Sequence, residues 1–399
     1  MSPESLLLLP LPSEYLTHRS IAERYQQPLA SALNQLRNPQ HSTTLVLAVV
    51  GPFLQRGHDN DGGRQSISWS QIQSTLSGFY SLVAFLCAKQ SIATDIDAGP
   101  NSVDVRVVFV HAAPNARDQT ASNRFNGTII RDLDAFARIR NQWSSVFYLK
   151  TQEGRDLLDA YTQAASGRTP DNGTVGLDCS SSIQHGVHFE PTHGTIATTS
   201  GYRIVCLGGT FDHLHPGHKL LLSAAATLLE IPLSSTSPSR FVIGITGDEL
   251  LRNKKYAEYV QSWDVRARGV LDFLHTFIDC ENQVEPQVSP RSAKELIGTY
   301  RDGNIVVECV EIQEPFGPTI TIENMDVLVV SGETRSGGQA VNDKRKEKGW
   351  NEVKVYEVDV LDAQGLVDND ATQPEGFGAK ISSTAIREQK ANGAGSGRL

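Results

Sequence analysis

Cysteine, methionine and positive charge are scarce in this sequence. It has five cysteines and two methionines among 399 residues. The cysteines are odd in number, scattered and without a C-x-x-C pair, which excludes a paired disulfide framework and fits a reducing compartment. Lys and Arg total 36 against 45 Asp and Glu, which gives a net charge of −9. Because a general nucleic-acid binder needs a basic face, we expect no nucleic-acid partner, and any anion site must be a local basic pocket.

Long apolar runs are also missing. No segment approaches the roughly 20 apolar residues that cross a bilayer. The four leucines at 6–9 are stopped by Pro10 and Pro12, and no basic stretch precedes them, so they do not resemble a signal peptide. Hydrophobic residues still make up 39% of the chain, which is enough to build a core. We therefore expect a cytoplasmic protein without a membrane partner, and the sequence does not exclude the nucleus.

The length predicts about two or three domains. Residues 1–165 predict an α/β unit of unknown role, with alternating strands and helices and no nucleotide motif. Residues 166–200 are rich in Gly, Ser, Thr, Pro and Asp, which is typical of a flexible linker. Residues 201–390 predict a second α/β unit, and 391–399 a disordered tail. In the first unit we expect strands at 45–50, 103–110 and 146–149, and helices at 69–89, 132–140 and 155–165.

The linker contains three histidines, His185, His188 and His193, together with Glu190. A metal site is conceivable there. Histidines in a flexible polar segment are usually solvated, however, so we expect none.

The second unit predicts five strands that alternate with helices. Repeated right-handed crossovers of this kind give a Rossmann-like, doubly wound parallel sheet. Ligands of such a sheet bind at the carboxyl ends of its strands. The expected strands are 204–207, 240–246, 305–312, 326–330 and 353–358.

A glycine turn follows the first of these strands. Gly208 and Gly209 allow the backbone to turn sharply and to approach a ligand. Pro216 suits the first position of the helix that follows, whose free N–H groups and partial positive charge attract anions. His215 and His218 lie at that same helix start. A metal pair and two capping histidines are the alternatives, and the metal pair lacks a third ligand at a familiar spacing.

A second anion-binding pattern precedes the last helix. Ser382, Ser383 and Thr384 place three hydroxyls there, and Arg387 follows one turn later on the same face. Hydroxyls, free N–H groups and a guanidinium suit a polyphosphate. A capped surface helix with an unrelated arginine is the alternative. Since ligands collect at one edge of the sheet, we expect His218 and Arg387 to share one cleft.

These segments resemble pantetheine-phosphate adenylyltransferases of the archaeal and eukaryotic type. That family belongs to the nucleotidyltransferase superfamily and is similar to the adenylyltransferase domain of eukaryotic coenzyme A synthase. The resemblance covers residues 201–390. It rests on GGTFDHLHPGHK at 208–219, KK at 254–255, EPFGPT at 314–319, SGET at 331–334 and ISSTAIR at 381–387.

The resemblance implies transfer of the adenylyl group of ATP to 4′-phosphopantetheine, with Mg²⁺ arriving on ATP and no metal site built by the protein. The implied catalytic residues are Thr210, His218, Lys254 and Lys255. The implied ATP-binding residues are Gly208, Gly209, Thr210, Phe211, His215, His218, Ser382, Ser383, Thr384 and Arg387. The implied acceptor-binding residues are Thr210, Lys254, Lys255, Arg266, Ser331, Glu333 and Thr334.

Several choices stay open within this resemblance. Either Lys254 or Lys255 could hold the acceptor phosphate, and Arg268 is an alternative to Arg266. His213 is a departure from the usual motif, since relatives often carry another side chain there. The motif spacing nevertheless favours His218 as the catalytic histidine.

Other functions remain as alternatives. The glycine-turn and ISST motifs are shared with nicotinamide mononucleotide adenylyltransferases, and cytidylyltransferases share the glycine turn but usually carry a different closing motif. A non-catalytic scaffold in a coenzyme A-synthesising assembly is a third hypothesis. No P-loop of the form GxxxxGK[ST] occurs in the sequence. We therefore expect an enzyme without dephospho-coenzyme A kinase activity, whose partners include a separate kinase.

Overall fold

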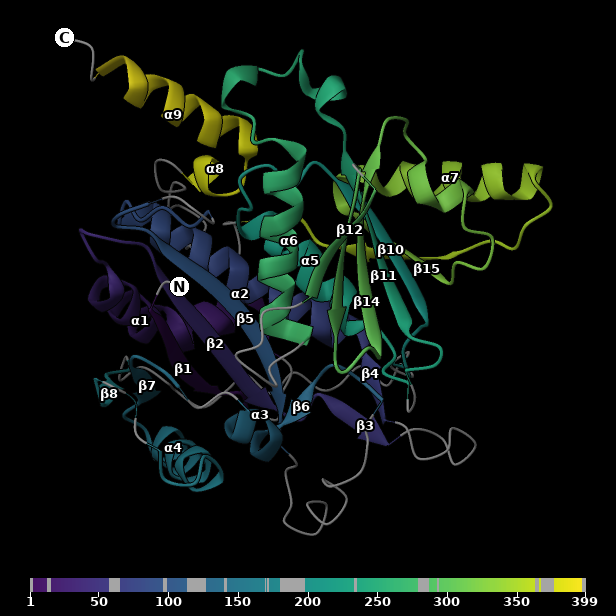
Figure 1. Cartoon of the computed structure of the whole chain (residues 1–399). Coiled ribbons are helices and arrows are strands. Elements are labelled where there is room, and N and C mark those ends of the chain that lie inside the picture. Colours follow the sequence, from purple (N-terminus) through teal and green to yellow (C-terminus); the bar gives the residue numbers. More distant parts are fainter. Residues whose placement is uncertain are drawn as a thin grey trace.

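The structure is a computed structural model of the whole chain. It describes residues 3–12, 16–56, 65–95, 99–112, 127–139, 142–168, 170, 172–179, 198–232, 235–278, 287–292, 294–362, 366 and 377–396. His185, His188 and His193 lie outside these residues. Two α/β domains, each built on one main sheet, follow one another along the chain (Figure 1).

The first domain has six parallel strands in the order β6-β5-β2-β1-β7-β8. The strands are β1 (Glu4–Pro10), β2 (Thr43–Gly51), β5 (Val103–His111), β6 (Arg131–Asp132), β7 (Val146–Leu149) and β8 (Thr174–Leu177). The helices are α1 (His18–Leu36), α2 (Trp69–Lys89), α3 (Leu133–Ile139) and α4 (Gln152–Ala164).

The four leucines near the start form the middle of this sheet. Leu6–Leu9 are fully buried in β1, which pairs with β2 on one side and β7 on the other. A parallel strand covered on both faces needs a continuous apolar run. Pro10 ends the strand. The sequence did not predict this strand, because the run is short and lies between prolines.

Two segments of the expected linker pair with the first domain. Strand β8 lies at 174–177, inside 166–200, and extends the first sheet next to β7. Strand β9 (Thr198–Thr199) pairs antiparallel with β4 (Gln65–Ser68), which in turn pairs with β3 (Leu54–Arg56). These parts of the range are therefore ordered strands rather than flexible linker.

The second domain has a seven-stranded sheet in the order β12-β13-β14-β11-β10-β15-β16. Its five parallel strands confirm the predicted doubly wound sheet: β10 (Ile204–Gly209), β11 (Ser239–Thr246), β14 (Ile305–Ile312), β15 (Val327–Ser331) and β16 (Lys354–Val358). Strands β12 (Gln287–Ser292) and β13 (Glu295–Tyr300) were not expected and add an antiparallel edge. The helices are α5 (Pro216–Thr227), α6 (Trp263–Ile278), α7 (Arg335–Glu347), α8 (Phe377–Lys380) and α9 (Ser383–Ser396).

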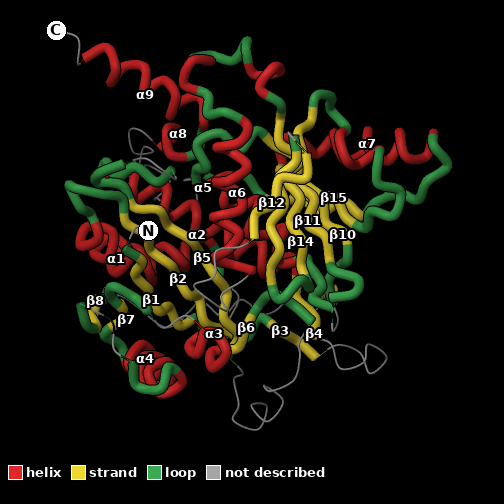
Figure 2. Tube along the Cα trace, in the orientation of Figure 1, coloured by secondary structure: helices red, strands yellow, loops and turns green. Residues whose placement is uncertain are grey.

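The chain reverses its direction of winding between β10 and β15. These two strands are neighbours, although β11 and β14 lie on one side and β16 on the other. The crevice beyond the carboxyl ends at such a switch point is the usual ligand site of this fold. Figure 2 shows β11, β10 and β15 together in the sheet, with loops at the ends of the strands.

Helix α2 joins the two domains into one body. It is buried almost all round, from Ile72 to Ala88, as expected for a helix with apolar residues on every face. It packs against α1 of its own domain and against α5 of the second (Figure 1). The largest hydrophobic cluster therefore contains residues of both sheets.

The last helix, α9, continues to Ser396, so residues 391–396 are helical where the sequence predicted a disordered tail. Among the described residues, no helix combines the length and hydropathy required of a membrane span.

Candidate active site

The glycine turn opens from the end of β10. The strand is buried through Leu207, whereas Gly208 is exposed. A Cβ added to Gly209 would lie 2.9 Å from the ring of Phe211, so that glycine is needed where the ring folds back. Phe211 and His213 have φ values of 52° and 47°, in the left-handed region that such residues rarely adopt. Strained backbone of this kind concentrates at functional sites.

Helix α5 begins at Pro216 with its first-turn N–H groups uncapped by a side chain. His215 occupies the N-cap position and makes no capping hydrogen bond. The rings of His215 and His218 stack, with centroids 3.8 Å apart and planes 22° from parallel. The capping alternative is therefore wrong for His215. The helix start offers N–H donors and two stacked imidazoles beside the glycine turn.

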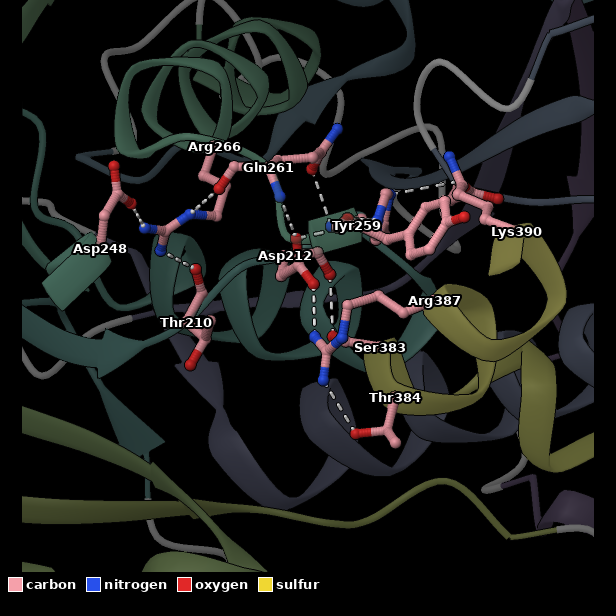
Figure 3. Close-up of polar contacts among 12 residues, drawn as sticks. Thr210, Asp212, Asp248, Tyr259, Gln261, Arg266, Ser383, Thr384, Arg387 and Lys390 are labelled. Atoms are coloured by element: carbon pink, nitrogen blue, oxygen red, sulfur yellow. Dashed lines mark hydrogen bonds and ion pairs between the residues drawn. The ribbon is translucent and has the colours of Figure 1, made fainter. Parts of the chain in front are cut away.

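Asp212 connects the glycine turn to the ISSTAIR segment at 381–387, called the closing segment below. Its carboxylate is fully buried. It accepts a hydrogen bond from the backbone N–H of Gln261 (2.9 Å) and pairs with Arg387 Nη1 at 2.5 Å (Figure 3). The Ser383 hydroxyl donates to the carbonyl oxygen of Asp212 at 2.8 Å. Arg387 also donates to Thr384 Oγ1. The structure thus brings the two predicted anion-binding segments together.

Arg387 is only 3% exposed, and its guanidinium lies against the Thr384 hydroxyl. Its Nε donates to the carbonyl oxygen of Lys255, so all three nitrogens have protein partners. Direct contact between Arg387 and a phosphate stays a prediction.

Arg266 is buried behind the glycine turn. Its side chain is 1% exposed and donates to the carbonyl oxygens of Gln261 (2.9 Å), Thr210 (2.6 Å) and Thr246 (2.8 Å) and to Asp248 Oδ1 (2.6 Å). Figure 3 shows the contacts of Arg266 with Gln261, Thr210 and Asp248. The alternative, Arg268, is instead an exposed partner of Asp264 on α6. In this structure Arg266 holds the turn in place, and its contact with substrate stays a prediction.

Lys254 and Lys255 lie on an exposed loop beside α9. Both side chains are exposed. The loop is fixed by the bond from Arg387 to the Lys255 carbonyl and by a hydrogen bond of 2.8 Å from the Tyr256 hydroxyl to Glu388. Two exposed positive charges therefore lie next to the closing segment, and the choice between them remains open.

The SGET segment follows β15, the neighbour of β10. Ser331 and Thr334 bond to each other through their hydroxyls at 3.2 Å, and Glu333 is exposed. The segment lies at the same sheet edge as the glycine turn because the two strands are parallel. The structure thus places all the predicted segments at the carboxyl edge.

Comparison with known proteins agrees with this geometry. A family model described as cytidylyltransferase-like matches residues 206–389, and the family described as domain of unknown function DUF8446 matches residues 1–188. The chain is 36% identical over 186 residues to phosphopantetheine adenylyltransferase of Saccharomyces cerevisiae, covering 47% of this chain and 48% of that protein. It is 32% identical over 260 residues to uncharacterized protein C1F12.08 of Schizosaccharomyces pombe, covering 63% and 67%.

The second domain is a cytidylyltransferase-like domain. It is also homologous to archaeal phosphopantetheine adenylyltransferases, such as that of Thermococcus gammatolerans, with 29% identity over 47% of this chain and 88% of that protein. The chain spans about half the length of the yeast relative. A crystal structure of a protein with unknown function from Archaeoglobus fulgidus matches with 25% identity and a TM-score of 0.28, over 43% of this chain and 96% of that chain.

Both histidines of this cytidylyltransferase-like site are held in the neutral form. Burial is the main cause that lowers the pKa of His218 to about 4, with Arg266 adding to it and Asp212 opposing it. Burial, followed by the charges of His218 and Lys219, lowers the pKa of His215 well below its usual range. A neutral imidazole can still donate one N–H hydrogen bond to a phosphate oxygen.

These shifts predict acid sensitivity of the fold. In the unfolded chain both histidines have the ordinary pKa of about 6.5. Below that pH the two histidines bind protons in the unfolded chain but stay neutral in the folded chain. The contribution of these histidines to the free energy of unfolding is therefore fully present above pH 6.5 and is lost as the pH drops toward 4. We expect the unfolding midpoint to decrease over this range. In H215Q/H218Q the unfolding midpoint should depend less on pH than in the wild type, whereas H41Q, at an exposed site, should behave like the wild type. The same pH dependence in the wild type and both variants would contradict the assignment of acid sensitivity to His215 and His218.

The EPFGPT segment at 314–319 is held by a residue that sequence reasoning missed. Arg345 on α7 is fully buried and donates to the carbonyl oxygens of Thr319 (2.7 Å), Ile322 (2.9 Å) and Glu323 (2.5 Å). Its only sequence signal is a position in a basic helix, where an exposed side chain is the usual expectation.

R345M should therefore destabilise the protein. The three carbonyl oxygens would lose their donor, and the one at the buried Thr319 would be left without this partner, so we expect the free energy of unfolding to fall by about 3 kcal/mol. The neighbouring K344M, at an exposed position, is the matched control. Urea denaturation measures both, and equal stability of the two variants would show that Arg345 does not hold the segment.

Two aspartates were also missed as site residues. Asp212 holds Arg387, and Asp248 pairs with Arg266 at 2.6 Å. Asp212 belongs to the GTFD motif, so its position was a usable signal, whereas Asp248 lies outside the motif segments. Among the described residues, no group of three or more His, Cys, Asp or Glu side chains could hold a metal ion.

Proposed function

We propose that this protein transfers the adenylyl group of ATP to 4′-phosphopantetheine, giving dephospho-coenzyme A and pyrophosphate. The single observation that carries the proposal is the contact of Ser383 and Arg387 with Asp212, since it forms one polar cradle from two anion-binding segments. The names of the yeast and archaeal relatives support the choice of acceptor.

The chemistry requires no protein nucleophile. An oxygen of the acceptor phosphate attacks the α-phosphorus of ATP, the bond between that phosphorus and the bridging oxygen to the β-phosphate breaks, and pyrophosphate leaves. The protein has to align two anions and to neutralise the charge that develops on the α-phosphate. Preorganised N–H donors achieve this at little reorganisation cost.

His218 is assigned to the α-phosphate. It lies in the first turn of α5, directly after the glycine turn, where an N–H of its neutral ring can donate to a non-bridging oxygen. Thr210, at the end of β10, lies next to that position and is assigned to the α-phosphate or the acceptor phosphate. His215 stacks on His218 and keeps its ring in place.

The closing segment is assigned to the departing pyrophosphate. Ser382, Ser383 and Thr384 supply hydroxyls and the free N–H groups of the first turn of α9. Arg387 adds positive charge. Lys254 and Lys255 are assigned to the acceptor phosphate because both are exposed beside this segment.

Magnesium is treated as part of the substrate, MgATP. Two carboxylates near the turn, Asp212 and Asp248, are each paired with a buried arginine. Asp212 is fully buried, and both oxygens of Asp248 accept hydrogen bonds, from Arg266 and from the backbone N–H of Trp263. The ion therefore comes bound to phosphate oxygens and water, and no step depends on a metal site of the protein.

A pyrophosphate-release assay tests the proposal. Purified full-length protein is mixed with MgATP and 4′-phosphopantetheine, nicotinamide mononucleotide or phosphocholine, and CTP replaces ATP in a parallel series. We expect release only with ATP and 4′-phosphopantetheine, together with dephospho-coenzyme A detected by mass spectrometry. Release with nicotinamide mononucleotide or with CTP would assign the alternative activity, and no release with any pair would favour the scaffold.

A further inference from the structure

The residue directly after His218 extends into the other domain. Lys219 is fully buried, and its Nζ donates to Asp104 Oδ1 at 2.5 Å and to the carbonyl oxygen of Thr94 at 2.8 Å. Asp104 lies on β5 of the first domain. The first turn of α5, which carries His218, is therefore bound to a strand of the first sheet.

The same carboxylate belongs to a wider buried network. Asp104 Oδ2 accepts from Arg106 Nε at 2.8 Å, and Arg106 reaches Asp272 Oδ2 (2.6 Å) and Thr276 Oγ1 (2.7 Å) on α6. Although burial disfavours its charged form, Arg106 and Lys219 hold the pKa of Asp104 below its usual value. One strand of the first domain thus fixes both helices that flank the active site.

We propose that Asp104 is a positioning residue for catalysis: through Lys219 it sets the rotation of the first turn of α5 and hence the place of His218. The proposal rests on the function proposed above. It also gives the first domain a role, as a fixed support for the nucleotide-binding edge of the second domain.

Burying the Lys219–Asp104 ion pair has a desolvation cost, and this cost favours a positioning role for the pair over a purely stabilising one. Replacing a buried ion pair with apolar side chains of similar size is often neutral or stabilising, whereas removing one partner is strongly destabilising. The core around Lys219 is otherwise apolar, with Leu220, Leu222 and Ala224 fully buried or nearly so. Apolar packing tolerates small rotations of a helix, but the two directional hydrogen bonds that Lys219 Nζ donates do not.

A second carboxylate of the first domain reaches the turn itself. Asp95 is 7% exposed and lies 3.9 Å from His213 Nδ1 and 3.9 Å from Lys390 Nζ. The backbone N–H of His213 is held by Gln261 at 2.8 Å. The first domain therefore approaches the site at the turn as well as at the helix.

The test is the double variant D104L/K219M, which removes both charges together so that neither is left unpaired; Arg106 loses its bond to Asp104 but keeps its ion pair with Asp272. We expect a folded protein with KM values within threefold of the wild type and a kcat lowered by about 10- to 100-fold, because misplacement by 1 Å can cost about 100-fold. The matched control is R240M/E308L, which removes a well-formed ion pair with 2.8 Å bonds elsewhere in the second sheet. Its kcat should match the wild type.

A second readout separates this proposal from the proposed function. The ring resonances of His218, in protein labelled at histidine, should shift in D104L/K219M and stay in place in R240M/E308L. This holds even if the acceptor proves not to be 4′-phosphopantetheine. A wild-type kcat together with unshifted His218 resonances in the folded double variant would overturn the proposal.

If the double variant does not fold, D104E keeps the charge and moves the carboxylate by one methylene. We then expect a lowered kcat and shifted His218 resonances at near wild-type stability. Wild-type values of both in D104E would equally overturn the proposal.

Discussion

H218A should lower kcat by at least about 100-fold while the protein remains folded. Loss of one aimed hydrogen-bond donor to a developing oxyanion costs about 100- to 1,000-fold in kcat, and the proposed function assigns that donor role to His218. KM for ATP should change much less, because the closing segment and the backbone N–H groups still hold the triphosphate. Steady-state pyrophosphate release measures both constants.

H41A is the control for this experiment, since His41 is exposed and far along the chain from the glycine turn. Its kcat should equal that of the wild type. Circular dichroism and the unfolding midpoint should be similar for all three proteins. If folded H218A turns over at the wild-type rate, His218 has no part in the chemistry and His215 becomes the next candidate.

R387M should have the second large effect, on stability and on ATP binding together. The Asp212 carboxylate is fully buried, and its partner would be lost. Breaking one half of a buried ion pair costs about 3–5 kcal/mol. Because the same contact joins the closing segment to the glycine turn, we also expect the KM for ATP to rise by at least about tenfold. Urea denaturation and initial-rate kinetics give the two values.

The double variant D212N/R387M distinguishes the two effects. The amide side chain that replaces the carboxylate keeps an acceptor for the Gln261 N–H but carries no charge, so most of the lost stability should return. The raised KM for ATP should remain, because the ion pair between the glycine turn and the closing segment is still absent. R19M, at an exposed ion pair on α1, should change stability by less than about 1 kcal/mol. Full recovery of ATP binding in D212N/R387M would contradict a role for this contact in the cradle.

The site could be placed from the sequence because its parts share one edge of a parallel sheet. The glycine turn after 204–207 and the SGET segment after 326–330 both follow parallel strands, so predicting the strands was enough to place both at the same edge of the sheet. That the two strands are neighbours comes from the structure. The hydroxyls at 382–384 begin a helix, and the anion preference of a helix start pointed to the same place.

The functions of the buried arginines could not be predicted in the same way. The family resemblance assigned Arg266 to substrate, and the spacing after Ser382–Thr384 assigned Arg387 to a polyphosphate. In the structure, each of the two arginines donates to oxygens from several segments far apart in sequence. Only the folded chain brings those oxygens together. Lys219 is a similar case, since its partner Asp104 belongs to another domain and no local pattern links the two.

In the first domain, the sequence prediction missed β1 and β8. The four leucines of β1 form a central strand, and β8 lies within a segment whose composition is typical of a linker. Both strands are stabilised by neighbours on the sheet rather than by their own propensity. The longer strands at 45–50 and 103–110 have enough β-branched residues to be predicted alone, and the structure confirms both.

A crystal structure of the full chain with a non-hydrolysable ATP analogue, bridged by carbon between the α- and β-phosphates, tests the central claim most directly. We predict that one triphosphate lies between the two segments, with an α-phosphate oxygen within hydrogen-bond distance of His218 and the β- and γ-phosphates at Ser382–Thr384. A nucleotide bound elsewhere, or in contact with only one of the two segments, would contradict the account.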